Sequence, residues 1–431
     1  MKKNVAGILA ILSLASCSVQ KPEKFFKNND VERIIRTLAS DEMQGRATFT
    51  PGIEKAANFI ENEFKEIGLK PLNGESGFRQ TFWMTRLKPG LADIAIGDKK
   101  IADENVLVVT NQLELNLSNS SGVEIARIKA GENFQNRYRS LAQSDKPVIV
   151  LVDASFGDIF KRIKANAGRG RLVQKTGGNG AAIFVLGVDE APVFSVKFKN
   201  QSENLPLFNV AGMIPGKSKE KELVVFSGHY DHLGIIKPVG TDSIANGADD
   251  DASGVTAMIS LAKYYKKLNN NQRTLIFVAF TAEEIGGFGS RYFCERLNPD
   301  DVVAMFNIEM IGKDSKFGPN TAFITGYERS DFGQILQKNL EGTAFKFYPD
   351  PYPEQNLFYR SDNATLAALG VPAHTISTVQ IDGDKYYHTV KDEFETLDVN
   401  NISATIKAIA LSAQSIISGQ DTPKRIPKLK E

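Results

Sequence analysis

From residue 209 onward, continuous apolar runs alternate with stretches of helical periodicity. The apolar runs read KELVVFSG, RTLIFVAFT, VVAMFNIEMIG and VPAHTIST, and the helical stretches among them read GVTAMISLAKYYKKL and FGSRYFCERL. Strands that are apolar throughout are buried on both faces, as in a largely parallel sheet with helices on each side. The pattern therefore predicts an α/β fold with a mixed, mainly parallel central sheet covered by helices on both faces.

A further helix is predicted near the N-terminus, between Gly52 and Pro71. Apolar residues recur there every three or four positions, which places them on one face of an amphipathic helix. They are Ile53, Ala57, Ile60, Phe64 and Ile67. Gly68 and Pro71 are typical helix terminators, so we expect the helix to end beside them.

Between about residues 82 and 204 the pattern changes to short β-like runs and polar loops. The β-like runs read NVLVVTN, KPVIVLVD and GAAIFVLG, with one helix-like piece, SFGDIFKRIKANAGRGRLVQ. The region has no histidine and no concentrated set of catalytic residue types. We therefore predict a smaller β-rich inserted domain at 101–204, a discontinuous catalytic domain at 30–100 and 205–420, and a polar tail at 421–431.

Residues 1–16 are typical of a signal peptide. Two lysines precede an apolar run at residues 5–15 that is too short to span a bilayer. The run ends in LASC, which resembles a bacterial lipobox and implies a lipidated Cys17 followed by a tether at 17–29. We expect attachment to a membrane through this lipid, in the bacterial cell envelope, at the outer membrane or facing the periplasm. The alternative is an ordinary cleaved signal peptide.

Composition excludes several classes of protein. The 431 residues are 42% hydrophobic and carry a formal net charge of +1, so no global field would attract nucleic acid. Two cysteines cannot form a disulfide framework or a cysteine-type structural zinc site. All four histidines, His229, His232, His374 and His388, lie in the C-terminal half, so we expect any imidazole chemistry there.

Acidic and histidine side chains follow the ends of the predicted strands. They are His229, Asp231, Glu283, Glu284, Glu309 and His388. A row of three aspartates, residues 249–251, lies in the loop that opens the helix GVTAMISLAKYYKKL. Sites in open α/β sheets gather beyond the carboxyl ends of the strands. We therefore expect all these side chains at one edge of the sheet.

These residue types suit a catalytic metal. Neutral histidine and carboxylate are the ligands expected for catalytic zinc, and a carboxylate can bridge two ions in hydrolases with paired metals. Two divalent cations would also offset the repulsion within a carboxylate cluster. An unrelated calcium module, which would use oxygen ligands only, is the alternative that His229 and His388 argue against.

Five motifs occur in order along the chain: SGHYDHLG, NGADDDASG, FTAEEIGGFGS, NIEMIG and YYHTVKDEFETLD. Their order and approximate spacing resemble those of the co-catalytic zinc aminopeptidases and carboxypeptidases of the M28 type. The segment LASDEMQGRATFTPGIEKAANFIENEFKEIGLKP resembles that family's N-terminal helical segment, and the region around 105–200 resembles its protease-associated insert. The resemblance covers most of the chain and implies a zinc-exopeptidase-like fold.

The resemblance implies two zinc ions per chain, held by five side chains. Asp250 would bridge both ions. His229 and Glu309 would complete one site, and Glu284 and His388 the other. The family usually has aspartate where this chain has Glu309, whose carboxylate reaches about 1.5 Å further; we still expect it to bind.

The resemblance also assigns residues that act beside the metals. Glu283 would be the general base that takes a proton from the metal-activated water, and Tyr387 would help stabilise the tetrahedral intermediate. Asp231 would accept the second ring N–H of His229, because residues two apart on a strand share a face. Asp251 would lie at a strained peptide linkage beside the bridging ligand, or cap the following helix.

Other polar residues near these motifs receive more ordinary interpretations. Asp249 is either a neighbour of the ligands or plain loop. His232 is expected to be a structural or rim residue, and His374, within an apolar run, a hydrogen-bonded core histidine. The stretch 358–373 looks like a substrate-pocket loop of the family, which often has histidine at the position of Asn363.

Together these observations predict a secreted, lipid-anchored zinc aminopeptidase that hydrolyses peptides. Alternatives on the same scaffold are a glutamate-type carboxypeptidase, a single-zinc glutaminyl cyclase and a receptor-like relative without activity. The last alternative is disfavoured because all five ligand positions hold chelating side chains and the base position holds Glu283. The insert is expected to shape access or to contact substrates or partner proteins.

Overall fold

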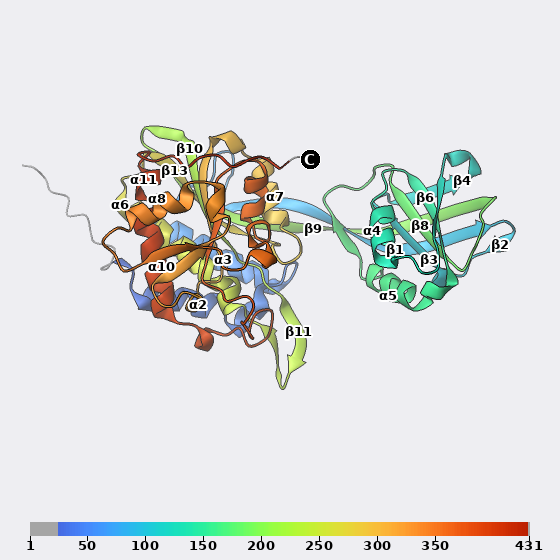
Figure 1. Cartoon of the computed structure of the whole chain (residues 1–431), viewed down its shortest axis with the longest axis horizontal. Coiled ribbons are helices and arrows are strands. Elements are labelled where there is room, and N and C mark those ends of the chain that lie inside the picture. Colours follow the sequence, from blue (N-terminus) through green and yellow to red (C-terminus); the bar gives the residue numbers. More distant parts are fainter. Residues whose placement is uncertain (1–24, 430–431) are drawn as a thin grey trace, which may run out of the picture. The chain divides into compact units, whose positions relative to one another are not determined.

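The computed structural model describes residues 25–429, which form two compact units (Figure 1). Unit 1 comprises the chain up to Gln80 and from Phe208 onward, and unit 2 comprises Thr81–Leu207. The predicted signal peptide and Cys17 lie outside the described residues. Within residues 25–429, no helix is both long enough and apolar enough to cross a membrane.

Unit 1 is built on a mixed sheet. In spatial order its strands are β16 (Lys346–Pro349), β15 (Thr321–Ile324), β17 (Ala373–Ser377), β14 (Val302–Ile308), β10 (Lys219–His229), β13 (Arg273–Phe280) and β9 (Phe194–Ile214). Strand β10 pairs in parallel with β13 and β14, and β14 pairs in parallel with β17. Strand β9 is antiparallel to β13, and β15 to β17. The prediction of a mixed, mainly parallel sheet is confirmed.

Two hydrophobic layers lie on opposite faces of this sheet. On β10, Val224 and Phe226 belong to one layer, and Val225, between them, belongs to the other. The first layer contains residues of α2 (Asn28–Leu38), α3 (Pro51–Ile67), α6 (Gly254–Leu268), α8 (Phe332–Asn339), α10 (Val399–Ser412) and α11 (Gln414–Ile417). The second contains residues of α7 (Phe288–Glu295) and α9 (Asn363–Ala368). Helices therefore cover both faces, as predicted.

The predicted helices appear where the periodicity placed them. Helix α6 covers the whole of GVTAMISLAKYYKKL, and α3 carries the predicted apolar face inward. Helix α3 ends at Gly68, whose backbone is left-handed with φ 77°. Glycine adopts this conformation without the steric cost of a Cβ atom, so the helix terminates there.

Unit 2 has its own sheet and its own core. Its four-stranded sheet has the order β3 (Val106–Thr110), β8 (Ala181–Leu186), β6 (Pro147–Val152) and β5 (Glu124–Ile128). Helices α4 (Phe134–Ala142) and α5 (Gly157–Ala167) pack on one face of it, where Phe160 and Phe184 are fully buried. Strands β2 (Lys99–Lys100), β4 (Glu114–Ser118) and β7 (Arg171–Val173) pair with β1 (Arg79–Ile96) or β9 within this unit.

Three boundaries differ from the predicted ones. Residues 81–100 lie in unit 2 because β1 pairs there with β2 and β7. The tether was predicted to reach residue 29, but Phe26 is already part of the folded unit. Its ring is buried against Tyr264, with 5.2 Å between the ring centroids. The predicted polar tail is anchored, because Ile426 is buried and its N–H donates to the carbonyl of Gly370.

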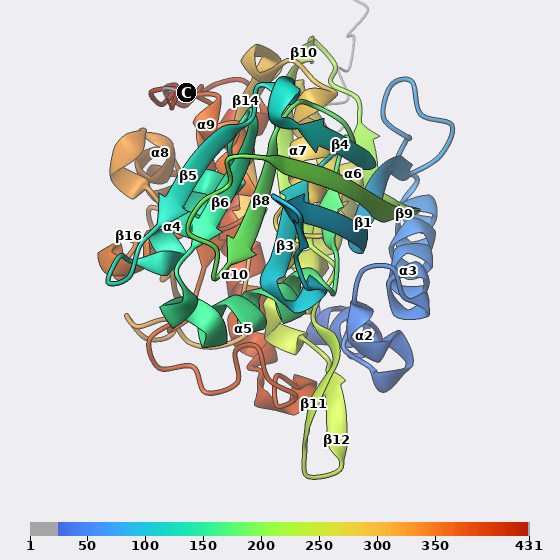
Figure 2. The same ribbon diagram turned by 90° about the vertical axis from the view of Figure 1, so that its right-hand side faces the viewer.

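The parallel strands bring three segments of the chain to one edge. His229 at the end of β10 pairs with Phe280 at the end of β13, and Ser227 pairs with Asn307 of β14. The loops that follow these strands therefore start side by side. The chain after β10 first forms a hairpin, β11 (Gly234–Val239) and β12 (Asp242–Ala245), which projects from the unit (Figure 2). It then enters a single π-type turn, Ala248–Ser253, before α6.

Candidate metal centre

Asp250 lies at the middle of a cluster of histidines and carboxylates. Its Oδ1 is 3.0 Å from Nε2 of His229, and its Oδ2 is 3.2 Å from Nε2 of His388. Burial opposes ionisation of Asp250, but its contacts with the two histidines hold its pKa well below the usual value. One carboxylate thus faces a different imidazole with each oxygen, which is the arrangement expected of a bridging ligand.

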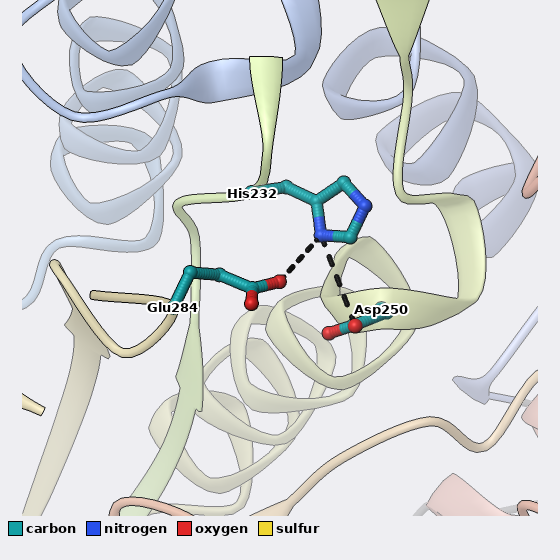
Figure 3. Close-up of side chains that lie close together, drawn as sticks. All are labelled: His232, Asp250 and Glu284. Atoms are coloured by element: carbon teal, nitrogen blue, oxygen red, sulfur yellow. Dashed lines mark ion pairs between the residues drawn. The ribbon is translucent and has the colours of Figure 1, made fainter. Parts of the chain in front are cut away.

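Glu284 faces the same side of Asp250 as His388. Its Oε2 is 3.2 Å from Nε2 of His388, and its Oε1 is 2.8 Å from Nδ1 of His232. Figure 3 shows His232, Asp250 and Glu284 converging from separate segments of the chain. His232 was expected at a structural or rim position, but its imidazole lies inside the cluster.

Glu309 also reaches the cluster, despite its extra methylene. It is partly buried and, with Asp250, Glu283 and His388, lines one small pocket. Burial raises the pKa of Glu309, while the nearby His229 lowers it. Its Oε2 has no hydrogen-bond partner. The structure therefore brings all five predicted metal ligands together.

Glu283 lies beside these residues in the same pocket. Its side chain is largely buried, and burial is the main reason that its pKa lies well above the usual value. A carboxylate with a raised pKa binds a proton more readily near neutral pH, as a general base must. Its place in the pocket is compatible with the predicted role.

Asp231 acts on a different partner from the one predicted. The Nδ1 atom of His229 is 3.1 Å from the backbone carbonyl oxygen of Asp231 and 3.9 Å from its carboxylate. The Asp231 carboxylate instead accepts the backbone N–H groups of Glu283, at 3.1 Å, and Glu284, at 3.3 Å. Asp231 thus holds the start of the loop that carries Glu283 and Glu284. The prediction that its side chain accepts the ring N–H of His229 is wrong.

Asp251 ties three backbone segments together. Its carboxylate accepts the backbone N–H groups of His229, Gly254 and Met310, each at 3.1 Å. The peptide bond between Asp250 and Asp251 is cis. Asp251 therefore fixes the ends of β10 and β14 against the start of α6, and its side chain makes no contact with the predicted metal ligands beyond the N–H of His229.

Asp249 points away from the cluster. Its Oδ1 accepts the N–H of Gly312 at 2.7 Å, and its Oδ2 is 3.2 Å from Nζ of Lys313. Lys313 in turn pairs with Asp384 at 2.7 Å. The three consecutive aspartates thus do three different things, and only the middle one faces the histidines.

Asp392 and Arg46, which were not predicted as site residues, hold the loops that carry the predicted metal ligands. Asp392 accepts the backbone N–H groups of both Asp249 and Asp250. Arg46 is fully buried and donates only to backbone carbonyl groups, those of Leu38, Tyr230, Asn246 and Gly247, at 2.5–2.9 Å. Asp392 lies in the motif HTVKD, which also carries His388, so the sequence offered a signal for it. No local sequence pattern indicated a role for Arg46.

Tyr387 and the substrate-pocket loop surround the cluster. The Tyr387 ring stacks on His388, with 3.9 Å between centroids, and lines the pocket together with Arg360 and Ser361. Burial raises the pKa of the Tyr387 hydroxyl, so this group stays protonated. Asn363 is buried and donates to the carbonyl of Phe358 at 2.9 Å, so it acts as a support of this loop.

His374 is a core histidine, as predicted. Its Nδ1 is 2.8 Å from the carbonyl oxygen of Thr325, and its Nε2 is 2.8 Å from Oγ of Ser330. Burial lowers its pKa to about 4. The prediction of a satisfied buried imidazole is confirmed.

The donor set fits divalent cations. Three histidines and several carboxylates converge, and many of their polar atoms are buried. Among the described residues, the buried atoms without a hydrogen-bond partner include both ring nitrogens of His232, Oε1 of Glu284 and Oε2 of Glu309. Buried polar groups are costly unless they are paired or bind a metal. Nitrogen and carboxylate oxygen ligands of this kind suit zinc.

The fold and part of the sequence are similar to those of known proteins. Residues 209–413 match the family model described as Peptidase family M28. Aminopeptidase YwaD from Bacillus subtilis (strain 168) is 20% identical over 346 residues, which cover 71% of this chain and 70% of that protein.

Solved structures show the same fold. An aminopeptidase from Aneurinibacillus sp. strain AM-1 superposes with a TM-score of 0.52 at 19% identity, covering 94% of this chain and 96% of the other. BSAP, a zinc aminopeptidase from Bacillus subtilis, gives a TM-score of 0.54 at 15% identity, covering 92% and 97%. These likenesses show the mixed α/β architecture.

Proposed function

We propose that this protein is a two-zinc aminopeptidase that removes N-terminal residues from peptides. The observation that carries the proposal is the position of Asp250, whose two oxygens face His229 and His388. A carboxylate shared by two histidines, with further carboxylates on each side, is suited to hold a pair of ions. The similarity to aminopeptidases supports the choice of substrate.

In this proposal, His229 and Glu309 bind one ion, Glu284 and His388 bind the other, and Asp250 binds both. When bound, such ions polarise a carbonyl group and lower the pKa of water. Each ligand comes from a different loop at the carboxyl edge of the sheet. The rigid strands beneath these loops therefore set the spacing of the ligands.

Glu283 is proposed to move the proton. Its carboxylate takes a proton from the attacking water and delivers it to the nitrogen of the leaving peptide. The raised pKa of Glu283, caused mainly by burial, supports this role. Asp231 holds the backbone N–H of Glu283 and so orients the base without touching the substrate.

Tyr387 is proposed to donate a hydrogen bond to the oxygen that becomes negatively charged during attack. Its hydroxyl stays protonated because burial raises its pKa. Its ring is fixed by stacking on His388, so little reorganisation is needed when charge develops. Apolar side chains of Phe323, Leu357 and Val379 line the same pocket.

The test combines metal analysis with a substrate panel. Purified protein should contain two zinc ions per chain and release the chromophore from several aminoacyl nitroanilides at neutral pH. N-acetylated versions of the same substrates should remain intact, since an aminopeptidase requires a free amine. Removal of residues from the C-terminus of a blocked peptide, or cyclisation of glutaminyl peptides with one zinc bound, would replace the proposal by one of its alternatives.

We also propose that the enzyme is held in the bacterial cell envelope by a lipid on Cys17, based on the lipobox-like sequence LASC. Metabolic labelling with a clickable fatty acid in a bacterial host should mark the wild-type protein and not Cys17→Ser. The labelled protein should sediment with membranes, and the variant should not. Equal labelling of both would remove this part of the proposal.

A further inference from the structure

We infer that His232 is a ligand of the metal ion that Glu284 and His388 bind, an inference that rests on the metal centre of the proposed function. The similarity of sequence motifs assigns five ligands and leaves His232 out. The structure places its imidazole within the cluster, between Asp250 and Glu284 (Figure 3).

The distances among the ligand atoms of four residues match one coordination shell. From Nδ1 of His232, Oε1 of Glu284 is 2.8 Å away and Oδ2 of Asp250 is 3.8 Å away. From Nε2 of His388, Oδ2 of Asp250 and Oε2 of Glu284 are both 3.2 Å away. Ligand atoms about 2.0–2.1 Å from a tetrahedral zinc ion lie about 3.3–3.4 Å from one another. The observed spacings bracket that value.

The environment of His232 leaves its imidazole without another partner. Its side chain is fully buried, and neither ring nitrogen has a partner in hydrogen-bond geometry. His374, the other imidazole buried in unit 1 away from the cluster, has a partner on each nitrogen. A buried imidazole whose Nδ1 points between two carboxylates is placed as a metal ligand would be.

The surrounding backbone holds the ring in this orientation. The N–H of His232 donates to the carbonyl of Arg46 at 3.3 Å. Gly247 packs directly on the ring, because a Cβ added there would lie 2.6 Å from Cγ and Cδ2 of His232. Its backbone is also left-handed, with φ 57°. Glycine at this position lets the loop before the aspartates approach the imidazole and fix it.

This assignment makes the two ions unequal. With His232, the ion bound by Glu284 and His388 has four protein ligands, counting its share of Asp250. The ion bound by His229 and Glu309 keeps three. Structural zinc sites are closed by four protein ligands, whereas catalytic sites keep one position open. We therefore infer that the substrate is engaged on the side of His229 and Glu309.

The test measures metal binding directly. His232→Ala and His232→Gln should lose one of the two zinc ions on dialysis against a buffered chelator, or bind it roughly 100-fold more weakly. Mutating a residue that only orients a metal ligand already weakens metal binding by up to about 100-fold. Their cobalt-substituted forms should lose visible absorption from one four-coordinate site. His374→Gln is the matched control for loss of a buried imidazole and should keep both ions.

A second measurement uses the unaltered protein and so does not depend on the variants folding. Cobalt-loaded wild type should show three hyperfine-shifted, exchangeable imidazole N–H signals in its proton NMR spectrum, one each from His229, His232 and His388. Two signals, or full retention of both ions by folded His232 variants, would overturn the inference and leave the two-zinc proposal standing. Wild type that binds no zinc would instead overturn the proposed function.

Discussion

Asp392 accepts the backbone N–H of Asp250 at 3.0 Å, while the side chain of Asp250 faces His229 and His388. The same carboxylate accepts the N–H of Asp249 through both oxygens, at 3.0 and 3.1 Å. Burial is the main cause that raises the pKa of Asp392, to about 8. One side chain from the segment after His388 thus positions the residue that is proposed to join the two metal ions.

We predict that Asp392→Asn weakens metal binding, although Asp392 contacts only the backbone of a proposed metal ligand. An amide oxygen at the place of Oδ2 can still accept both N–H groups, but the amide NH2 then takes the place of Oδ1, where it faces the N–H of Asp249 donor against donor, at a cost of about 1–3 kcal/mol. Zinc affinity should fall roughly 10- to 100-fold, as for other residues that orient ligands. Competition with a fluorescent chelator measures this. Asp300→Asn, an exposed change in unit 1, should match wild type, and an unchanged affinity in Asp392→Asn would refute the positioning role.

Glu283→Gln should separate metal binding from turnover. Glutamine has nearly the same shape but cannot accept the proton, so the rate constant for turnover should fall by roughly 10²- to 10⁴-fold, the usual contribution of a general base. Zinc content should stay at the wild-type value. Glu295→Gln, an exposed change on α7, serves as the control. Substantial activity in Glu283→Gln would reassign the base.

Arg46→Lys should be far more damaging than a conservative change of charge suggests. The planar guanidinium reaches four carbonyl groups on three segments, and an ammonium group cannot satisfy all of them. We expect the free energy of unfolding to fall by about 3 kcal/mol or more, because buried acceptors lose their donors.

Denaturant titration of Arg46→Lys provides the measurement, and zinc affinity should fall with stability because Arg46 holds the carbonyls of Tyr230 and Gly247 beside the ligand loops. Arg36→Lys on the exposed face of α2 should change stability by less than about 0.5 kcal/mol. If Arg46→Lys behaved like this control, the buried hydrogen bonds would carry little energy.

His374 should make stability depend on pH below neutrality. Its pKa of about 4 in the folded protein lies below the usual 6.5, so between these values the unfolded chain binds a proton that the folded protein does not. Stability therefore falls as the pH drops from 6.5 toward 4, by an amount on the order of 3 kcal/mol for this group.

The check compares unfolding free energies of wild type and His374→Gln at pH 7 and pH 5. The variant is expected to be less stable at pH 7 but to lose less on acidification. Metal-linked effects occur in both proteins and cancel in the difference. Identical pH dependence in the two proteins would show that His374 titrates normally.

The sequence by itself determined several elements of unit 1 and the edge at which the site lies. Helix α6 and strands β10, β13 and β14 follow from periodicity alone, because the spacing of apolar residues is a local property of the chain. The residues Glu283 and Glu284 were placed at the carboxyl edge for the same reason, since they follow a buried strand directly.

The tertiary structure decided which polar groups actually meet. Arg46 reaches carbonyl groups up to 201 residues away, and Asp392 reaches the aspartate loop from 142 residues away. His232 was predicted to be a structural or rim residue because its partners, Asp250 and Glu284, come from other loops. The carboxylate of Asp231 was predicted to contact His229 but contacts the backbone of Glu283. Hydrophobic patterning specifies where a strand ends, whereas the partner of a buried polar side chain is chosen by the packing of segments distant in sequence.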